Sequence, residues 1–249
     1  MPTPAKPVKV LGVIPARLAS TRLQHKVLRH ILGEPLLAWV HRAASACSQL
    51  DRIIIAADSE EVMALCAESG FEAILTSPDL PSGSDRLFAV AQQVPAEIYV
   101  NIQGDEPLLE PAHITALLEP FSKPDVEVTT LKVRCAPDEI NNPNAVKVVT
   151  APDGRALYFS RATIPFHRDS GADTIYFKHL GLYAYRSAAL SHFAALAPTP
   201  LELAERLEQL RLLENNINLY VTETPHDTIG VDTEEDLARV EAIIKSRIK

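Results

Sequence analysis

The first half of the chain alternates short apolar runs with longer stretches in which apolar residues recur at helical spacing. The run over 8–14 and the Ile-rich run over 52–57 are typical of strands buried on both faces of a sheet. The segment 35–48 between them has the period of an amphipathic helix. Alternating strands and helices predict a parallel sheet covered by helices. The same pattern predicts helices over 60–69 and 84–94, and strands over 73–76 and 98–102.

The second half has a more mixed pattern, and we expect some of its strands to be antiparallel. One long helix is predicted over 201–215, with leucines such as Leu203 and Leu207 in its apolar stripe. The last helix starts at Thr233-Glu-Glu-Asp236, a near capping box with acid in the first turn, and runs to about residue 247. The predicted strands cover 126–134, 146–150, 180–185 and 218–222.

These elements predict an α/β fold with a mixed, mostly parallel central sheet and helices on both faces. The sequence contains no linker run, low-complexity tract or internal repeat. We therefore expect residues 1–249 to form one continuous domain. Its insertion-like middle, residues 130–185, is a candidate surface for oligomer formation.

Composition narrows the class of protein. Hydrophobic residues make up 47% of the chain and charged residues 22%, which is ordinary for a globular protein. No apolar run approaches the ~20 residues of a membrane helix, and the N-terminus lacks the apolar centre of a secretion signal. Three scattered cysteines favour neither a disulfide framework nor a zinc site. We expect a cytoplasmic protein without membrane insertion, and the net charge of −8 argues against general nucleic-acid binding.

The segment after the first predicted strand inverts this negative charge. The first 33 residues hold six Lys or Arg and no carboxylate, and Arg17, Arg22 and Lys26 lie within ten residues of one another. Ligands of open α/β sheets bind outside the carboxyl ends of the strands, where this loop would lie. It therefore predicts a polyanion site, with a solvated basic loop as the alternative. It contains neither a P-loop nor a dinucleotide-binding glycine pattern, which disfavours kinases and dehydrogenases.

Two further apolar segments each end in an aspartate. Asp105 follows the predicted strand 98–102, and Asp232 follows a short apolar stretch before the last helix. Mg²⁺ typically takes one or two protein carboxylates together with substrate phosphates, so this pair could complete a metal–triphosphate site. The alternatives are a simple Gly-Asp turn and ordinary helix capping.

Three lesser features extend the hypothesis. The turn that contains Ser82 and Gly83 leads into a helix, where exposed amides could bind a base or a phosphate. Arg161 and Arg168 place cations in a loop-rich region that suits an acidic substrate, or surface salt bridges. His179 stands at a strand start, where a structural role is the more common one.

Several segments, in this order, resemble the 3-deoxy-manno-octulosonate cytidylyltransferase (CMP-Kdo synthetase) family over about residues 8–240. Together they are far more specific than any one alone. They are Pro15-Ala-Arg-Leu-Ala-Ser-Thr-Arg-Leu23, Asn101-Ile-Gln-Gly-Asp-Glu-Pro107, Asn142-Pro-Asn-Ala-Val-Lys-Val-Val149, Ala156-Leu-Tyr-Phe-Ser-Arg-Ala-Thr-Ile-Pro165, His179-Leu-Gly-Leu-Tyr183, Leu207-Glu-Gln-Leu-Arg211 and Gly230-Val-Asp-Thr233.

The resemblance implies a nucleotidyltransferase of glycosyltransferase-A-like fold, usually a homodimer. It would transfer CMP from CTP to 3-deoxy-manno-octulosonate (Kdo) and release pyrophosphate, for lipopolysaccharide synthesis. The implied catalytic residues are Arg17, Lys26, Asp105 and Asp232, the last two as Mg²⁺ ligands. The implied nucleotide-binding residues are Arg17, Ser20, Arg22, Lys26, Ser82 and Gly83. The implied sugar-acid pocket consists of Gln103, Arg161, Arg168, His179, Tyr183, Glu208 and Gln209.

The first loop departs from the family pattern Arg-Leu-Pro-Gly-Lys-Pro-Leu. Gln24 and His25 replace Pro and Gly, and Val27 replaces the second Pro, whereas Lys26 keeps its place. Losing the glycine can remove a backbone position of positive φ, and losing two prolines makes the loop less pre-ordered.

Three alternatives stay open. The acceptor could be an 8-amino analogue of Kdo, or another nonulosonic acid such as sialic acid, although sialic-acid enzymes carry a different first loop. The chain could instead be a non-catalytic nucleotide-binding or assembly subunit, a reading supported only by the first-loop departure. Retention of Arg17, Lys26, Asp105 and Asp232 speaks against that subunit.

Overall fold

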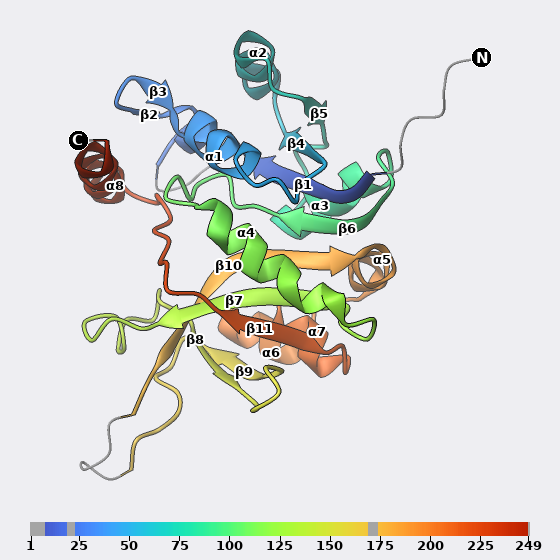
Figure 1. Ribbon diagram of the computed structural model, residues 1–249, viewed down its shortest axis with the longest axis vertical. Coiled ribbons are helices and arrows are strands. Elements are labelled where there is room, and N and C mark those ends of the chain that lie inside the picture. The colour runs from blue at the N-terminus through green and yellow to red at the C-terminus, as the bar shows by residue number, and fades with distance from the viewer. Residues whose placement is uncertain (1–7, 19–22, 169–173, 249) are drawn as a thin grey trace. The chain divides into compact units, whose positions relative to one another are not determined.

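The computed structural model describes residues 8–18, 23–168 and 174–248 (Figure 1). Two compact units emerge. The first contains residues 8–18, 23–115 and 228–248, and the second contains the described residues from 116 to 227. The expected single domain stays a prediction. In these described ranges no helix is long and apolar enough to cross a membrane.

The first unit is built on a parallel sheet, because its strands are apolar on both faces and connected by helices. β1 lies between β4 and β6, so Val13 pairs with Ile54 on one side and with Asn101 on the other. Val13 and Ile54 are fully buried. In spatial order the strands are β6 (Ala96–Asn101), β1 (Val8–Ala16), β4 (Arg52–Ala57) and β5 (Ala73–Leu75).

The helices of this unit have clear sequence punctuation. The Ser59 hydroxyl accepts a hydrogen bond from the amide of Val62, and Gly70 ends that helix with φ 70°. Thr233 and Asp236 form the expected capping box of the last helix. The helical segments are η1 (Lys26–Leu28), α1 (Leu36–Ser45), α2 (Glu60–Ser69), α3 (Gly83–Ala91) and α8 (Glu234–Arg247), and β2 (His30–Ile31) pairs with β3 (Glu34–Pro35). α4 (Pro111–Leu118) contains the boundary between the units.

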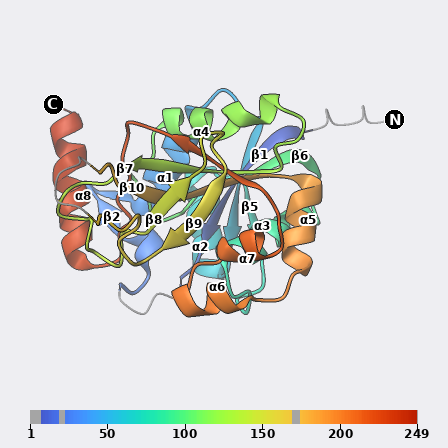
Figure 2. The same ribbon diagram turned by 90° about the horizontal axis from the view of Figure 1, so that it is seen from below.

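The second unit has a mixed sheet around β7 (Val128–Arg134). β11 (Leu219–Glu223) pairs with β7 in parallel, and β10 (Phe177–Arg186) pairs with it antiparallel, with a register shift between Leu180 and Tyr183. β8 (Lys147–Thr150) pairs with β10 and with β9 (Ala156–Ser160). Figure 2 shows β8 and β9 side by side. The helical segments are η2 (Glu119–Ser122), α5 (Ser187–Ala195), α6 (Pro200–Glu205) and α7 (Leu210–Glu214).

The predicted α/β class and its antiparallel strands in the second half are confirmed. The prediction of one long helix over 201–215 was wrong. The chain instead forms two helices, α6 and α7, with a break at Arg206, whose φ is 55°. The Arg161 guanidinium holds this break through the carbonyls of Glu205 and Arg206, at 2.8 and 3.4 Å. Leu203 consequently lies outside the apolar stripe and is 54% exposed.

Candidate functional site

One ammonium group bridges Asp105, in the loop after β6, and Asp232, just before α8; no strand directly precedes Asp232 in the described residues, contrary to expectation. Lys26 Nζ lies 2.5 Å from Asp105 Oδ2 and 2.9 Å from Asp232 Oδ1. The Lys26 side chain is 12% exposed, against 30% for Asp105 and 41% for Asp232. Burial lowers the pKa of Lys26, but the two carboxylates, Asp105 foremost, more than offset this and hold that pKa above its usual value. The predicted convergence of these three residues is therefore present in the structure.

The backbone around Asp105 explains how the two aspartates meet. Gly104 packs so closely on β1 that a Cβ there would lie 2.5 Å from the carbonyl oxygen of Pro15, so a larger residue would push the loop away. The amide of Val231 donates to the carbonyl of Asp105 at 2.9 Å, which places Asp232 beside it. The Asp232 amide in turn donates to Asp236 in the first turn of α8, at 3.1 Å.

Lys26 is presented by a tight turn. His25, just before η1, has φ 53° and ψ 35°, the left-handed conformation that glycine favours. The amide of Leu28 donates to the His25 carbonyl at 2.9 Å, and Arg29 forms an ion pair with Glu234 at the start of α8, at 2.7 Å. The positive-φ position that the loss of glycine threatened is thus retained, with a histidine in it.

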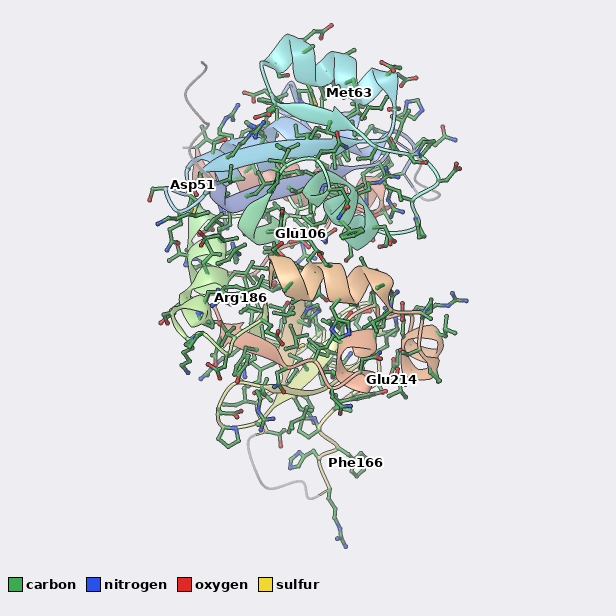
Figure 3. The ribbon with its side chains drawn as sticks, turned by 90° about the vertical axis from the view of Figure 1, so that its right-hand side faces the viewer. Asp51, Met63, Glu106, Phe166, Arg186 and Glu214 are labelled. Carbon is green, nitrogen blue, oxygen red and sulfur yellow. The ribbon has the colours of Figure 1, made fainter. Side chains whose placement is uncertain are left out.

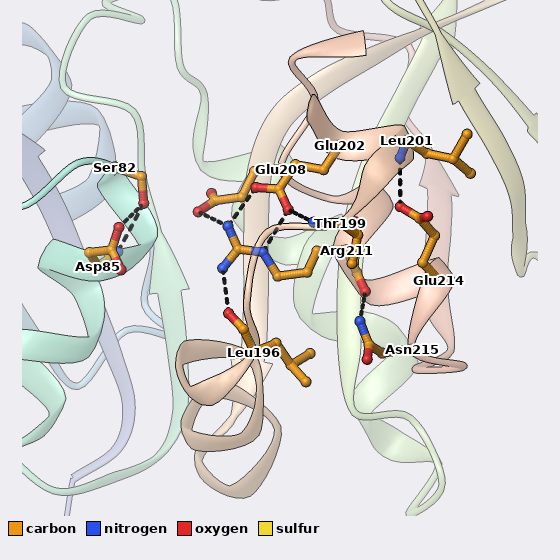
Figure 4. Close-up of polar contacts among 10 residues, drawn as sticks. All are labelled: Ser82, Asp85, Leu196, Thr199, Leu201, Glu202, Glu208, Arg211, Glu214 and Asn215. Carbon is orange, nitrogen blue, oxygen red and sulfur yellow. Dashed lines mark hydrogen bonds and ion pairs between the residues drawn. The ribbon is translucent and has the colours of Figure 1, made fainter. Parts of the chain in front are cut away.

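The other expected nucleotide residues of this unit lie at the end of β1 and at the start of α3. Arg17 is exposed, and its Nη1 donates to the carbonyl of Pro81 at 3.2 Å. Ser82 is the N-cap of α3 and exchanges hydrogen bonds with Asp85, as Figure 4 shows. Gly83 follows, against Pro15 of β1. Ser20 and Arg22 lie outside the described residues.

The expected sugar-acid residues are divided between the units. Gln103 belongs to the first unit, where its carbonyl accepts from the Glu106 amide at 3.3 Å. In the second unit, Arg161 donates its side-chain hydrogens to three carbonyls, those of Glu205, Arg206 and Pro143. Arg168 is exposed, near Phe166, which is 85% exposed and projects from its unit in Figure 3. Their sugar-binding roles stay predictions.

His179 is held as a neutral ring. Burial lowers the pKa of His179 to about 3. Its Nε2 lies 2.9 Å from Thr130 Oγ1, and that hydroxyl also lies 2.7 Å from the carbonyl oxygen of Leu182. Tyr183 lies beside the ring, with centroids 5.5 Å apart.

Glu208 and Gln209 occupy the connection between α6 and α7. Figure 4 shows Arg211 between Glu202 and Glu208. Arg211 Nη2 is 2.5 Å from Glu202 Oε1 and 3.8 Å from Glu208 Oε1, and the Arg211 and Glu202 side chains are each 11% exposed. Arg211 thus fixes the start of α7, immediately after Gln209.

The residues present fit a magnesium site. Among the described residues no group of three or more His, Cys, Asp or Glu side chains could hold a metal. Mg²⁺ does not require such a cage, because it usually keeps several waters and takes one or two carboxylates plus phosphates. Asp105 and Asp232 already share one cation, the Lys26 ammonium, so their oxygens converge on a point that attracts positive charge.

Sequence reasoning missed two buried partners of this region, Asp58 and Arg86. Asp58 follows β4 directly, just as the Asp105 loop follows β6, so its position at a strand end was the available signal. Its side chain is 6% exposed and that of Arg86 is fully buried.

Comparison with known proteins identifies the chain. The fold is that of a nucleotidyltransferase, and the sequence model of the cytidylyltransferase family matches residues 11–223. A curated relative from Acidobacterium capsulatum, a 3-deoxy-manno-octulosonate cytidylyltransferase, is 64% identical over 97% of this chain and 99% of its own. Another from Koribacter versatilis, of the same name, is 54% identical over 96% of this chain and 92% of its own. The chain belongs to the 3-deoxy-manno-octulosonate cytidylyltransferase family.

Solved structures agree with this assignment. A CMP:2-keto-3-deoxy-manno-octonic acid synthetase complexed with CTP is 38% identical, with a TM-score of 0.92 over 96% of this chain and 99% of its own. A 4-diphosphocytidyl-2C-methyl-D-erythritol synthase from Anaerococcus prevotii, 12% identical with a TM-score of 0.65, shows the shared fold. The predicted family and nucleotidyltransferase fold are confirmed.

Proposed function

We propose that this protein transfers CMP from CTP to Kdo and releases pyrophosphate. The observation that carries the proposal is the bridge from Lys26 to Asp105 and Asp232, in a chain of this family. The bridge gathers cationic and carboxylate groups in one place, as a metal–triphosphate substrate requires.

Asp105 and Asp232 would hold Mg²⁺. When bound, the ion neutralises charge on the phosphate oxygens and lowers the pKa of a hydroxyl that it contacts. These aspartates come from segments 127 residues apart, held together by the hydrogen bond from the Val231 amide to the Asp105 carbonyl. Metal binding thus draws on backbone that is already in position.

The cations of the first unit would bind the triphosphate. Arg17 offers a fork that grips phosphate oxygens, and Lys26 offers a mobile point charge on a flexible stem. Ser20 and Arg22 would contribute from the same loop, and Ser82 and Gly83 would lie near the cytosine. Lys26 is already bound to the Mg²⁺ ligands, so a small rotation of its side chain would move its charge between carboxylate and phosphate.

The reaction is an in-line displacement at the α-phosphorus. The oxygen of the sugar's anomeric hydroxyl forms the new P–O bond, the bond to the bridging oxygen of pyrophosphate breaks, and the hydroxyl proton passes to solvent. The protein's work is to position the reactants and to stabilise the developing charge. Lys26 and Arg17 would stabilise charge on the pyrophosphate that leaves.

Gln103 in the first unit, and several residues of the second unit, keep as proposals the sugar-binding roles that the family resemblance implies. His179 is neutral, so it would contact the sugar acid as a hydrogen-bonding group without charge. Tyr183, Arg168, Glu208 and Gln209 would complete the recognition, while the Arg161 guanidinium is committed to three carbonyls. A homodimer that uses residues 130–185, in the cytoplasm, remains our expectation.

Pyrophosphate release from CTP tests the proposal, measured with Kdo, with its 8-amino analogue and with sialic acid, with and without Mg²⁺. We expect Mg²⁺-dependent release with Kdo. Asp105→Asn should reduce turnover by orders of magnitude, whereas Asp51→Asn, at an exposed aspartate beside the start of β1 in the same unit, should not. Near-normal Mg²⁺-dependent release by Asp105→Asn would remove Asp105 from the metal site, and no release with any sugar acid would refute the proposed function.

A further inference from the structure

Asp58 forms a hydrogen bond with the backbone at the start of the basic first loop. Its Oδ1 accepts a hydrogen bond from the Leu18 amide at 3.0 Å, although the two residues are 40 positions apart. Leu18 directly follows Arg17 and lies beyond the end of β1, so no strand neighbour pairs with it. The Asp58 carboxylate, whose side chain is 6% exposed, therefore accepts the backbone hydrogen bond that a neighbouring strand would accept within the sheet.

The second oxygen of Asp58 faces a buried guanidinium. Asp58 Oδ2 lies 3.7 Å from Arg86 Nη2, and the Arg86 side chain has no exposed surface. Arg86 Nη1 donates to Thr76 Oγ1 at 2.7 Å and to the Ser77 carbonyl at 2.9 Å. Within the described chain, Arg86 Nε is buried without a hydrogen-bond partner. Asp58 thus forms an ion pair with this buried charge, and Asp85 also acts on it electrostatically.

The pair joins two segments that the proposed function assigns to one nucleotide. On one side it holds Arg17 and Leu18 at the start of the triphosphate loop. On the other it holds residues 76–78, which lead directly to Ser82 and Gly83. A second link, from Arg17 Nη1 to the Pro81 carbonyl at 3.2 Å, joins the same two segments. The distance between the groups proposed to bind the phosphates and those proposed to bind the base therefore depends on Asp58 and Arg86, which are buried and are not themselves proposed to contact CTP.

The geometry points to Asp58 and Arg86 as positioning residues for the nucleotide: they fix the start of the triphosphate loop relative to the turn before α3. This inference rests on the proposed function, since it assigns the two segments to CTP. A purely structural role would make the same pair stabilise the fold without affecting nucleotide binding. The two roles differ in what a substitution does to CTP affinity.

The chain supplies a matched control at the other end of the same strand. Asp51 Oδ2 accepts hydrogen bonds from the amides of Lys9 and Val10, each at 2.9 Å, and so lies at the opposite end of β1 from Leu18. Asp51→Ala releases backbone amides within β1, whereas Asp58→Ala releases the Leu18 amide just beyond the end of that strand. Asp51→Ala changes neither segment assigned to CTP.

The experiment measures three quantities in wild-type protein, Asp58→Ala, Asp58→Asn and Asp51→Ala. They are hydrogen exchange at the Leu18 amide by NMR, the dissociation constant of Mg-CTP by calorimetry without sugar, and KM and kcat for pyrophosphate release. Asp58→Ala should speed Leu18 exchange and raise both the dissociation constant and KM for CTP about tenfold, with kcat nearly unchanged, as expected for one lost hydrogen bond to a charged group. Asp58→Asn should fall between, because one carboxamide oxygen cannot serve both Leu18 and Arg86.

Asp51→Ala should lower thermal stability and leave CTP binding at the wild-type value. An Asp58→Ala variant that is destabilised but binds CTP within about twofold of wild type would overturn the positioning role, since a factor of two is below the effect of one such bond. An unprotected Leu18 amide in wild-type protein would overturn it even if Asp58→Ala does not fold. Wild-type protein that binds no CTP would overturn the proposed function as well.

Discussion

Lys26→Met tests whether the lysine bridge supports the first unit and shares its ligands with a divalent cation. Methionine keeps much of the length and apolar surface of the stem and removes the charge. Asp105 and Asp232 then face each other without the cation that lies within 2.9 Å of both. The substitution should destabilise the protein, and a saturating divalent cation should offset the loss.

The magnitude follows from the exposure of the two pairs. A hydrogen bond to a charged group contributes about 1.5–3 kcal/mol when buried, and an exposed ion pair about 0.2–1 kcal/mol. Lys26 is 12% exposed, and its partners are 30% and 41% exposed, so the Asp105 pair lies near the lower end of the first range and the Asp232 pair within the second. Together they give a loss of about 2 kcal/mol, or about 4–8 °C in melting temperature for a chain of this size.

The assay is thermal unfolding of wild-type protein, Lys26→Met and the exposed-lysine control Lys9→Met, with rising Mg²⁺ or Mn²⁺ and no nucleotide. A cation at one hundred times its dissociation constant returns about 2.7 kcal/mol. We expect a larger cation-induced rise in Lys26→Met than in the other two proteins, because the lysine no longer competes for the carboxylates. An unchanged melting temperature in Lys26→Met would refute the estimate, and an equal cation response in all three would refute the shared site.

Three further predictions concern stability. His25→Gly should stabilise the protein by up to about 1 kcal/mol in urea unfolding, because glycine adopts φ 53° without the cost that a Cβ imposes; a loss of stability would show that the His25 side chain makes a compensating contact. The His179 pKa of about 3 lies below its unfolded value, so only the unfolded state gains this proton between pH 6.5 and 3. Stability should therefore decrease as the pH is lowered through this range, by up to about 1.4 kcal/mol per pH unit from this residue. His179→Gln should flatten that slope. Glu202→Gln should cost about 2 kcal/mol, because the Arg211 guanidinium, 11% exposed, loses the charge of its nearer carboxylate partner while Glu208 stays 3.8 Å away; a cost below about 1 kcal/mol would contradict this burial argument.

Much of the first unit was predictable because its signals are local. Strands of continuous Val and Ile, helices ended by Gly70 or started by Thr233, and Asp105 just beyond a strand are all visible along the sequence. Parallel strands carry their carboxyl ends to one edge of a sheet. That rule was enough to expect Asp105 close to the first loop, and the 2.5 Å contact with Lys26 agrees with it.

The failures arise where a distant side chain decides the local backbone. The leucine period over 201–215 is helical, but Arg161 binds the carbonyls of Glu205 and Arg206 from another element and ends α6 there. No periodicity within the segment contains that information. Asp58 and Arg86 were not predicted for a related reason. Asp58 pairs with Arg86, 28 residues away, and with the Leu18 amide, 40 residues away, and neither pairing is visible in the local sequence.

The first loop shows why a changed motif need not mean a changed site. A histidine replaces glycine before Lys26, yet the backbone keeps φ 53° there, and Lys26 still reaches both aspartates. The turn is held from outside, by the ion pair of Arg29 with Glu234 and by the bridge itself. Such contacts impose the left-handed turn on a residue that would not choose it, at a cost of about 1 kcal/mol. The replacement of glycine by His25 therefore costs local backbone strain but leaves Lys26 in contact with Asp105 and Asp232, the geometry that defines the candidate site.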